Sequence, residues 1–505
     1  MIMGLSISQV LVSQFVTGHS VIFQGDLVQP QKGVLIADPN FKTPLLRLTD
    51  ARAAGIHGLF PDYSKRQAWN SNESLMILRS GTGEAYLYNG QTYEYLRILD
   101  GIGGEDVFWH PTNPDLILYN PDSILYSYNV LNDAVTPIHV FAPYTWANTR
   151  GEGNLSNDGR YYAVVGQMYN YTTGEVVFHD LLVYDMLNNS IPASLPLPQG
   201  QLADFDWVSI SPLGNYVVVD YADEETGRYH GVEVYDRNFN FIWQKGLGAG
   251  HSDLGLDAGG QEVLIMDVYD DNANMTHINK YSLATGAETR LLSVSPFFDL
   301  HISCRALSRP GWAIISTFDY TGRLTDDNAG WLPFEDEVFA LKMDGTGSVE
   351  RYAHHHSRRF SPSTPDPDNS VYFAEPHATV SKYGTRILFG SNWRTNISED
   401  TSLDAYLVDL TNMLTGLPGE SPMLSESDFK IFPNPVNNQL NIIAAQNVRD
   451  YYVRIFDPAG KLVKEYFVNQ SNTTLNLSDL PAGIFYYKIA DGEGLKLDVG
   501  KVVKF

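Results

Sequence analysis

Three histidines have the residue types and neighbours that a metal site or a proton-transfer site needs. His251 lies in GHSDLG, His301 in LHISCR and His377 in EPHATVS, with Glu375 two residues before the last. Imidazole is the commonest metal ligand in proteins and a natural general base near neutral pH. If the fold brings these side chains together, they could hold a divalent cation or accept a proton. The alternative is three histidines that are hydrogen-bonded separately.

A repeated turn indicates the elements that would position these histidines. A polar turn of the form Ser-x-x-Gly, followed by a short run of β-branched or aromatic residues, recurs along the chain. Its copies, some of them divergent, start at Ser71, His110, Ser156, Ser211, Asp257, Ser308 and Ser381. A period of about 45 residues with a hairpin turn is typical of propeller blades. The sequence therefore predicts an all-β fold with a seven-bladed β-propeller over residues 33–410.

The segments on either side of the repeats complete the predicted domain organisation. A ring of blades must close, and Thr43–Asp50 (TPLLRLTD) could supply an outer strand to the last blade. Residues 1–32 form a weakly apolar N-terminal segment without the charged start of a signal peptide, which suggests a degenerate or trimmed signal region. Residues 411–428 are rich in Gly, Pro and Ser and are predicted to be a linker.

The residues before the repeated turns should gather at one mouth of the propeller. The residues that lie four positions before the seven turns are, in order, Gln67, Asp106, Glu152, Trp207, Asp253, Cys304 and His377. Most are polar, where a packed core would prefer apolar side chains. We expect a substrate-binding site formed by Arg66, Gln67, Asp106, Glu152 and Asp253. The alternative is that propeller channels are polar whether or not they bind anything.

The end of the chain is a separate small domain. Short alternating runs in FKIFPNPVNNQL (from Phe429), VRIFDPAGKLV (from Val453), LNLSDLPAGIFYYK (from Leu475) and KVVKF (from Lys501) are bounded by Pro- and Gly-containing turns. Such runs predict a small Ig-like antiparallel β-sandwich over residues 429–505. The order of these four blocks closely resembles the type A C-terminal sorting domain of the type IX secretion system of Bacteroidetes. The resemblance implies the secretion machinery as a partner, and a secreted or outer-membrane-surface location.

Composition excludes several classes of protein. The 505 residues carry a net charge of −25 and no run of Lys or Arg, so nucleic acid is not an expected partner. The single cysteine, Cys304, excludes an intramolecular disulfide, and we expect it to be buried and structural. No apolar run reaches the roughly 20 residues that a transmembrane helix needs. We expect a monomer.

The histidine pattern resembles a second family. A seven-bladed propeller whose last blades read His…His-x-x-x-Ser-x-x-Gly resembles oligogalacturonate lyase and, more loosely, other propeller-fold polysaccharide lyases. In that family a divalent metal is held by a His of one blade and by a Gln-x-x-His-x-His run. His301 and His377 match the first and last ligands, while Glu375 and Tyr372 replace the middle His and the Gln. The resemblance implies a divalent metal (Mn, Ca or Zn) held by His301, Glu375 and His377.

A lyase acting on uronate polysaccharides needs a cation to neutralise the uronate carboxylate and a base to remove the C5 proton. Arg305, Arg150 and Arg66 are the candidate neutralising groups, and His251 is the candidate base. Because the protein is acidic overall, capture of a polyanion would require a locally positive mouth. The predicted function is therefore an exported polysaccharide lyase acting by β-elimination. A non-catalytic surface propeller that binds glycan or protein, and a purely structural module, are the alternatives.

A second histidine-rich run, HHHSRR over residues 354–359, could be a metal or phosphate patch. Because it falls in the longest interval between repeated turns, we interpret it as a solvated loop.

Overall fold

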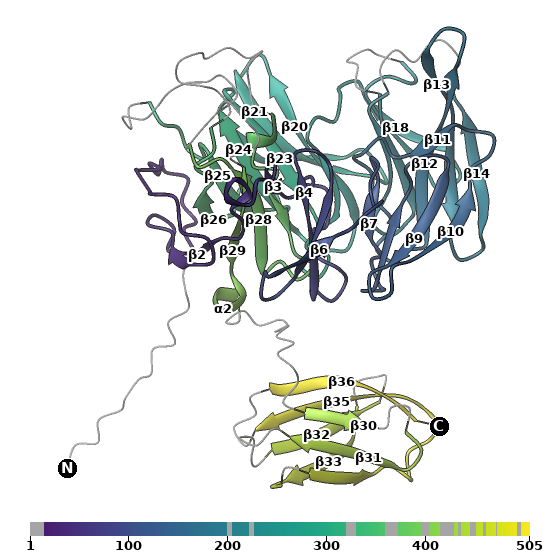
Figure 1. Ribbon diagram of the computed structural model, residues 1–505, viewed down its shortest axis with the longest axis vertical. Helices are drawn as coiled ribbons and strands as arrows, with labels where there is room; N and C mark the ends of the chain where they lie inside the picture. Colours follow the sequence, from purple (N-terminus) through teal and green to yellow (C-terminus); the bar gives the residue numbers. More distant parts are fainter. Residues whose placement is uncertain are drawn as a thin grey trace. The chain divides into compact units, whose positions relative to one another are not determined.

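The computed structural model describes residues 15–198, 205–221, 227–319, 330–358, 372–394, 403–414, 429–432, 436–444, 451–457, 461–470, 472–491 and 496–504. The chain divides into two compact units, Met1–Pro418 and Gly419–Phe505. Both units are built of antiparallel strands (Figure 1). None of the helices among the described residues has the length and apolar character needed to cross a membrane.

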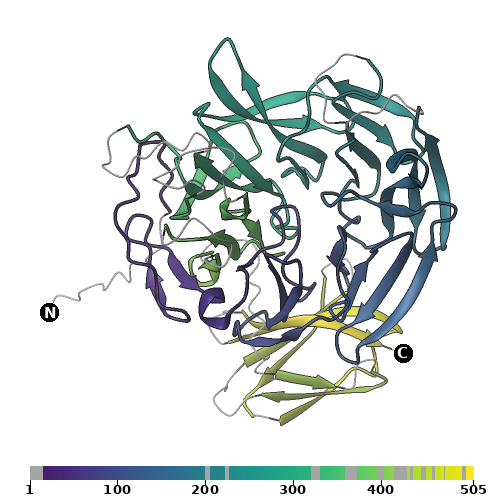
Figure 2. The same ribbon diagram turned by 45° about the horizontal axis from the view of Figure 1, so that its top comes forward.

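The described residues of the first unit form seven β-sheets, which follow one another around a ring (Figure 2). The first sheet contains β3 (Leu59–Phe60), β4 (Leu75–Ser80), β5 (Ala85–Asn89) and β6 (Tyr95–Ile98). The second contains β7 (Val107–Trp109), β8 (Leu116–Tyr119), β9 (Ile124–Asn129) and β10 (Ala134–Val140). The third contains β11 (Trp146–Asn148), β12 (Tyr161–Asn170), β13 (Glu175–Asp185) and β14 (Ser190–Pro196). The fourth contains β15 (Trp207–Ile210), β16 (Tyr216–Asp220), β17 (Val232–Asp236) and β18 (Phe241–Lys245). The fifth contains β19 (Asp253–Leu256), β20 (Glu262–Asp270), β21 (Met275–Ser282) and β22 (Glu288–Val294). The sixth contains β23 (Phe298–Ser303), β24 (Trp312–Asp319), β25 (Glu337–Lys342) and β26 (Val349–His354).

The seventh sheet closes the ring with strands from both ends of the unit. Its order is β1-β2-β29-β28-β27, with β1 (Leu35–Ala37), β2 (Pro44–Arg47), β27 (Thr379–Val380), β28 (Arg386–Ser391) and β29 (Asp404–Asp409). Leu45 of β2 lies opposite Val408 of β29. The expected outer strand from residues 43–50 is therefore confirmed. One short helix, α1 (Ala51–Ala54), follows β2, and a single 3-10 turn, η2 (Tyr372–Ala374), precedes β27.

The repeated turns connect the first and second strands of the sheets. Five of them place glycine at the fourth position with φ between 74° and 86°: Gly159, Gly214, Gly260, Gly311 and Gly384. This left-handed conformation favours glycine because a Cβ would clash with the backbone there. The turn chemistry visible in the sequence thus produces the hairpins that the structure shows. The predicted all-β propeller is confirmed, and its sheets equal the repeated turns in number.

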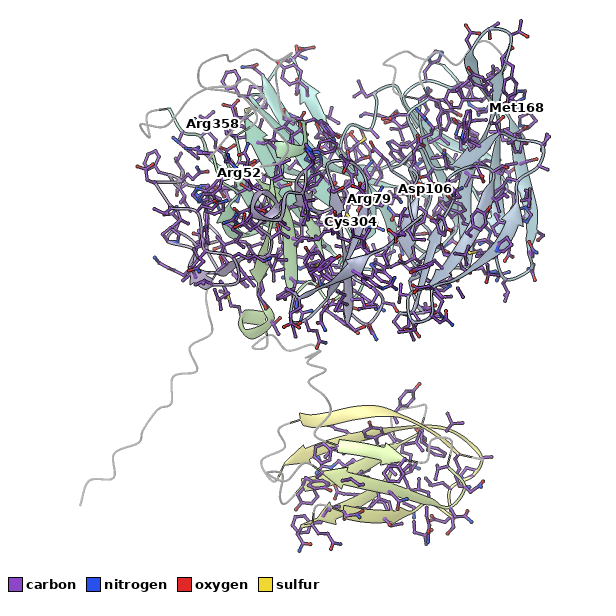
Figure 3. The ribbon with its side chains drawn as sticks, in the orientation of Figure 1. Arg52, Arg79, Asp106, Met168, Cys304 and Arg358 are labelled. Carbon is purple, nitrogen blue, oxygen red and sulfur yellow. The ribbon has the colours of Figure 1, made fainter. Side chains whose placement is uncertain are left out.

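The core of this unit lies between neighbouring sheets. One apolar cluster joins Val165 and Val183 of the third sheet to Val208 and Val219 of the fourth. A single four-stranded sheet cannot bury both faces, so each sheet is stabilised by its neighbours. Cys304 is buried among such residues, as expected, and Asp106 and Cys304 both lie in the interior of the unit (Figure 3).

The second unit is a small sandwich of two sheets. One contains β30 (Phe429–Phe432), β31 (Gln439–Ala444) and β34 (Asn472–Asn476); the other contains β33 (Leu462–Val468), β32 (Tyr451–Phe456), β35 (Gly483–Asp491) and β36 (Lys496–Lys504). In β31, Leu440 and Ile442 point inward and alternate with more exposed residues, and they pack with Val453 and Ile455 of β32. Side chains of a β-strand alternate between its two faces, so this period of two is expected for a strand that packs one face against a core.

The predicted flanking segments fall partly within the described residues. The linker predicted at 411–428 begins with a short helix, α2 (Thr411–Leu414), and its remainder lies outside the described residues. In the N-terminal segment 1–32, residues 1–14 also lie outside them. Its described part packs on the propeller, where Val16 forms a β-bridge with Arg351.

Candidate functional site

One loop of the first sheet reaches residues of all the other sheets. Residues 61–67, here called the axial loop, follow β3 and precede the bridge between Trp69 and Met76. The contacts of the axial loop include Asp106, Glu152, Trp207, His251, His301 and His377, which belong in turn to the second through seventh sheets. The loop therefore occupies the centre of the ring and forms the inner surface against which a site can be built.

The predicted histidines come together beside Tyr63 of this loop. The ring centroids of His251 and His301 are 4.3 Å apart, and those of His301 and His377 are 4.1 Å apart. Glu375 places Oε2 3.5 Å from His301 Nε2 and 3.8 Å from His377 Nε2. We call these four residues the histidine cluster. His301, His377 and Glu375 are buried, while His251 is half-buried.

Three members of the cluster have the geometry of a metal site. One ligand atom each from His251, His301 and Glu375 lies within 4.8 Å of the others. Two imidazoles and a carboxylate are a donor set that suits first-row transition metals and zinc. The sequence assigned the metal to His301, Glu375 and His377 and treated His251 as a base, whereas the geometry groups His251 with the ligands.

Tyr63 orients His251, and the sequence analysis missed it. The hydroxyl of Tyr63 and Nδ1 of His251 share a hydrogen bond of 2.9 Å. Burial, helped by the negative charge of Glu152, raises the pKa of the Tyr63 phenol well above its ordinary value, so the phenol stays protonated. Since Nδ1 is occupied, Nε2 is the nitrogen of His251 that remains for a ligand or a proton. The only sequence signal for Tyr63 is its position, three residues before the predicted site residue Arg66.

Three further carboxylates, Asp299, Asp267 and Asp206, lie near His251. Asp299 Oδ2 lies 3.8 Å from His251 Nε2. Burial and the negative charge of Asp299 raise the pKa of Asp267 to about 6, although the nearby His251 opposes the shift. Burial and the charge of Glu152 also raise the pKa of Asp206. This environment favours a bound cation, because a positive charge would be stabilised by each of these carboxylates.

The arginines predicted to neutralise a substrate carboxylate already face acidic side chains. Arg305 contacts Asp253 through Nε at 3.1 Å and Nη2 at 2.9 Å, and both side chains are buried. Arg66 Nη2 lies 2.7 Å from Asp106 Oδ1, also buried. Arg150 makes a longer, more exposed contact with Glu105, 3.4 Å. These pairs already engage the guanidinium groups that a uronate bound at the histidine cluster would need.

The remaining predicted substrate-binding residues hold the axial loop in place. Glu152 Oε2 accepts a hydrogen bond of 2.5 Å from Lys65 Nζ. Gln67 Nε2 donates to the carbonyl oxygen of Arg305 at 3.2 Å. Asp106 and Asp253 are occupied by the arginines described above. Gln67, Asp106, Glu152 and Asp253 thus share a layer of ion pairs and hydrogen bonds, and the histidine cluster is a separate group.

The interpretation of the second histidine run as a solvated loop is wrong. His354, His355 and His356 are all buried, and His354 Nε2 lies 3.0 Å from the carbonyl oxygen of Ile22. His356 stacks on Trp393 with 4.3 Å between ring centroids. The N-terminal segment covers these residues, a long-range contact that a local pattern cannot reveal. Arg359 lies outside the described residues.

The second unit matches a known domain family. Residues 430–504 match the family model of the secretion system C-terminal sorting domain. The C-terminal sandwich is a sorting domain. The protein is therefore a secretion cargo destined for the cell surface or the extracellular space, as predicted, and the secretion machinery is its partner. A search of curated proteins found no match.

Solved structures resemble the propeller. An oligogalacturonate lyase in complex with manganese matches with a TM-score of 0.51 and 13% identity, covering 75% of this chain and 96% of that one. An oligogalacturonate lyase from Vibrio parahaemolyticus matches with a TM-score of 0.53 and 12% identity, covering 77% and 98%. At such identities the likeness shows the propeller fold alone.

Proposed function

We propose that this protein is an exported propeller that binds a divalent cation in its histidine cluster and acts on uronate-containing polysaccharides by β-elimination. The observation that carries the proposal is the convergence of His251, His301 and Glu375 from three sheets on one point. The resemblance to oligogalacturonate lyase, one of which binds manganese, supports the same chemistry.

The donor set favours particular metals. Calcium prefers oxygen ligands, so two imidazoles favour manganese or zinc over calcium. In a metal-bound state, His251 would donate its Nδ1 proton to the Tyr63 oxygen and keep the Nε2 lone pair for the ion. A hydrogen bond on the second nitrogen is the usual way in which a protein orients a ligating histidine. A bound cation would supply the charge that neutralises the uronate carboxylate.

The chain's own residues then have distinct tasks. His301 and Glu375 are buried, so they would hold the ion, while His251 is half-buried and more accessible to a substrate. Nε2 of His251 cannot bind the ion and accept the C5 proton at the same time. We assign His251 to the ion, because Asp299 and Asp267 beside it favour a positive charge there. The C5 proton would then pass to the half-buried carboxylate of Asp299, and the departing glycosidic oxygen would take a proton from water.

The test measures metal and activity separately. The full chain is purified from medium containing manganese or zinc, and its metal content is measured by mass spectrometry. The same sample is incubated with polygalacturonate, alginate, ulvan and a neutral glucan, and unsaturated product is followed by ultraviolet absorbance. We expect bound metal, and product from an acidic polysaccharide only. Absence of metal at saturating supply would reject the site.

A second candidate is a non-catalytic glycan-binding propeller. It is favoured by the pairing of Arg66, Arg150 and Arg305 with Asp106, Glu105 and Asp253, which engages these arginines outside the histidine cluster, where a uronate undergoing elimination would have to be neutralised. Binding of an acidic polysaccharide without unsaturated product, in a metal-loaded sample, would decide for this candidate.

A further inference from the structure

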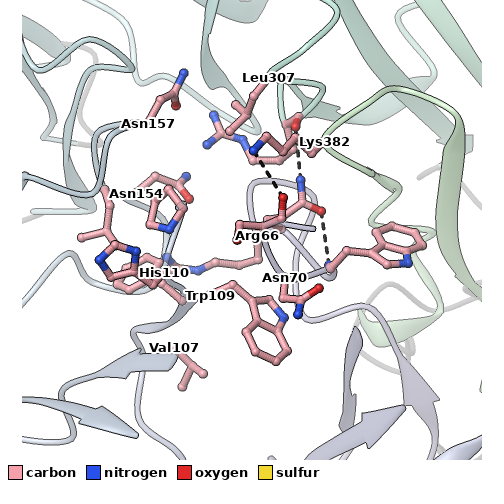
Figure 4. A pocket seen from close by; sticks show the side chains of 16 residues that line it. Arg66, Asn70, Val107, Trp109, His110, Asn154, Asn157, Leu307 and Lys382 are labelled. Atoms are coloured by element: carbon pink, nitrogen blue, oxygen red, sulfur yellow. Dashed lines mark hydrogen bonds between the residues drawn. The ribbon is translucent and has the colours of Figure 1, made fainter. Parts of the chain in front are cut away.

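A pocket lies at the end of the first strands opposite the histidine cluster. His251 and His377 precede the first strands of their sheets, whereas this pocket is lined by residues of the turns that follow such strands. Asn70, His110, Asn157 and Lys382 are among them (Figure 4). The space between these side chains opens to solvent, so a small molecule can enter it.

The lining of the pocket contains basic side chains and no acidic ones, although the protein is strongly acidic. Its 16 lining residues all belong to the described part of the chain, and they include Arg66, Arg305 and Lys382 but no Asp or Glu. The carboxylates of Asp106 and Asp253 contact the two arginines and do not line the pocket themselves. Buried carboxylates in this position fix the guanidinium groups, which are then oriented before any ligand arrives.

Hydrogen-bond donors remain for a ligand. Arg305 uses Nε and Nη2 for Asp253, and Nη2 also for the carbonyl oxygen of Leu254 at 2.7 Å. Among the described residues no acceptor bonds to its Nη1. Lys382 Nζ makes one long contact, 3.3 Å to the Ser71 carbonyl oxygen, which leaves further protons on the ammonium group.

The walls provide neutral groups that suit hydroxyls and a carbon skeleton. The side chain of Asn154 donates to the Lys65 carbonyl oxygen at 3.0 Å, and its own amide oxygen remains an acceptor. Asn157 adds a second amide. Val107, Trp109 and Leu307 supply apolar surface. A ligand that matches these features has one carboxylate, several hydroxyls and a compact carbon frame.

We propose that this pocket binds a small hydroxylated carboxylate such as a single sugar acid. The site is separate from the histidine cluster and needs no metal. Arg305 Nη1 and Lys382 would bind the carboxylate, and Asn154 and Asn157 would bind hydroxyls. The proposal stands independently of the catalytic function, because it rests on residues at the other end of the strands.

Calorimetry on the full chain tests the proposal, with D-galacturonate as the probe and D-galactose as its neutral analogue. We expect galacturonate binding that persists in chelator, and no measurable galactose binding. Lys382→Gln removes one charge-assisted hydrogen bond and should weaken binding about tenfold or more. Asn157→Leu should weaken it further from an independent side of the pocket. Lys342→Gln makes the same charge change on β25, outside the lining, and should have no effect.

Three results would overturn the assignment. One is the absence of galacturonate binding at millimolar concentration in a folded sample. Another is equal binding of galactose. The third is binding that Lys382→Gln and Asn157→Leu leave unchanged but that His301→Ala or chelator abolishes, because the sugar acid would then occupy the histidine cluster. Circular dichroism of each variant shows whether it is folded.

Discussion

At the scale of single residues, the candidate site depends on which nitrogen of each histidine is available. Tyr63 occupies Nδ1 of His251, and its phenol remains protonated because burial raises its pKa. His301 and Glu375 are held in the buried interior, where a metal ligand must be fixed before the ion arrives. The residue types were readable in the sequence, but their division between metal and proton chemistry depends on this hydrogen bond.

His251→Ala tests that division. We expect it to lower affinity for manganese or zinc by more than the roughly 10–100-fold that loss of an outer-shell partner costs, since it removes a ligand. His377→Asn should stay within that range, because His377 packs on His301 and lies outside the three-ligand group. Chelator competition measures both. Full metal affinity in His251→Ala with loss of product formation would restore His251 as the base.

Tyr63→Phe should weaken metal binding about 10–100-fold, because His251 loses the partner that fixes its ring. Its cost in stability should be only about 1 kcal/mol, since Phe retains the ring volume and one hydrogen bond is lost. Tyr221→Phe removes a hydroxyl from another buried tyrosine, whose oxygen bonds Tyr235, and serves as the control. Equal metal affinity in both variants would contradict a positioning role for Tyr63.

At the scale of elements, the N-terminal segment and β26 form one buried polar layer. Arg351 donates from Nη1 to the carbonyl oxygens of Gly18 and Ser20 at 2.8 and 2.7 Å, and it pairs with Glu337 of β25. His355 Nε2 donates to the Thr317 carbonyl oxygen, and its Nδ1 accepts from the Ser357 amide. The layer joins residues more than 300 positions apart, so local sequence patterns gave no indication of it.

Arg351→Ala should destabilise the propeller by about 3–5 kcal/mol, because Glu337 would remain buried without its partner. Burial already raises the pKa of Glu337 to about 7 against the opposing effect of Arg351. Lys342→Ala breaks an exposed pair with Asp344 and should cost under about 1 kcal/mol. Urea unfolding measures both changes. Similar midpoints for the two variants would show that the buried pair contributes little.

His355 should make the propeller sensitive to acid. Burial, helped by the positive charge of Arg394, lowers its pKa from 6.5 to about 3, although the hydrogen bond to the Thr317 carbonyl oxygen opposes the shift. Between these values the unfolded chain binds a proton that the native protein does not, so stability falls as pH falls through 6.5. From pH 6.5 to 5 the loss is about 2 kcal/mol for this group. Urea titrations at pH 6.5 and pH 5 measure this loss. Between these pH values, His355→Gln should lose about 2 kcal/mol less unfolding free energy than the wild type, and equal losses would refute the assignment.

At the scale of the whole molecule, the sequence predicted architecture well and the site only in part. Five of the seven repeated turns place glycine at positive φ, and that local requirement marks their hairpins. His251 and His377 could be found because they stand at comparable places before the first strands, whereas His301 lies within β23. The axial loop and the Arg305–Asp253 and Arg66–Asp106 pairs could not, because they depend on how sheets distant in sequence face one another.

The two units have separate cores and separate tasks. All residues of the propeller sheets and of the histidine cluster lie in Met1–Pro418, while the sorting domain lies in Gly419–Phe505. A chain ending at Pro418 should therefore keep the propeller's free energy of unfolding within about 0.5 kcal/mol of that in the full chain, and its metal affinity unchanged.

The same chain should remain inside the cell, because it lacks the domain that the secretion machinery recognises. Cell fractionation of the truncated and full chains decides the second point, and fusion of residues 419–505 to an unrelated reporter that carries an inner-membrane export signal is the matched control. If the truncated chain reached the medium or the cell surface as efficiently as the full one, sorting would have to depend on the propeller.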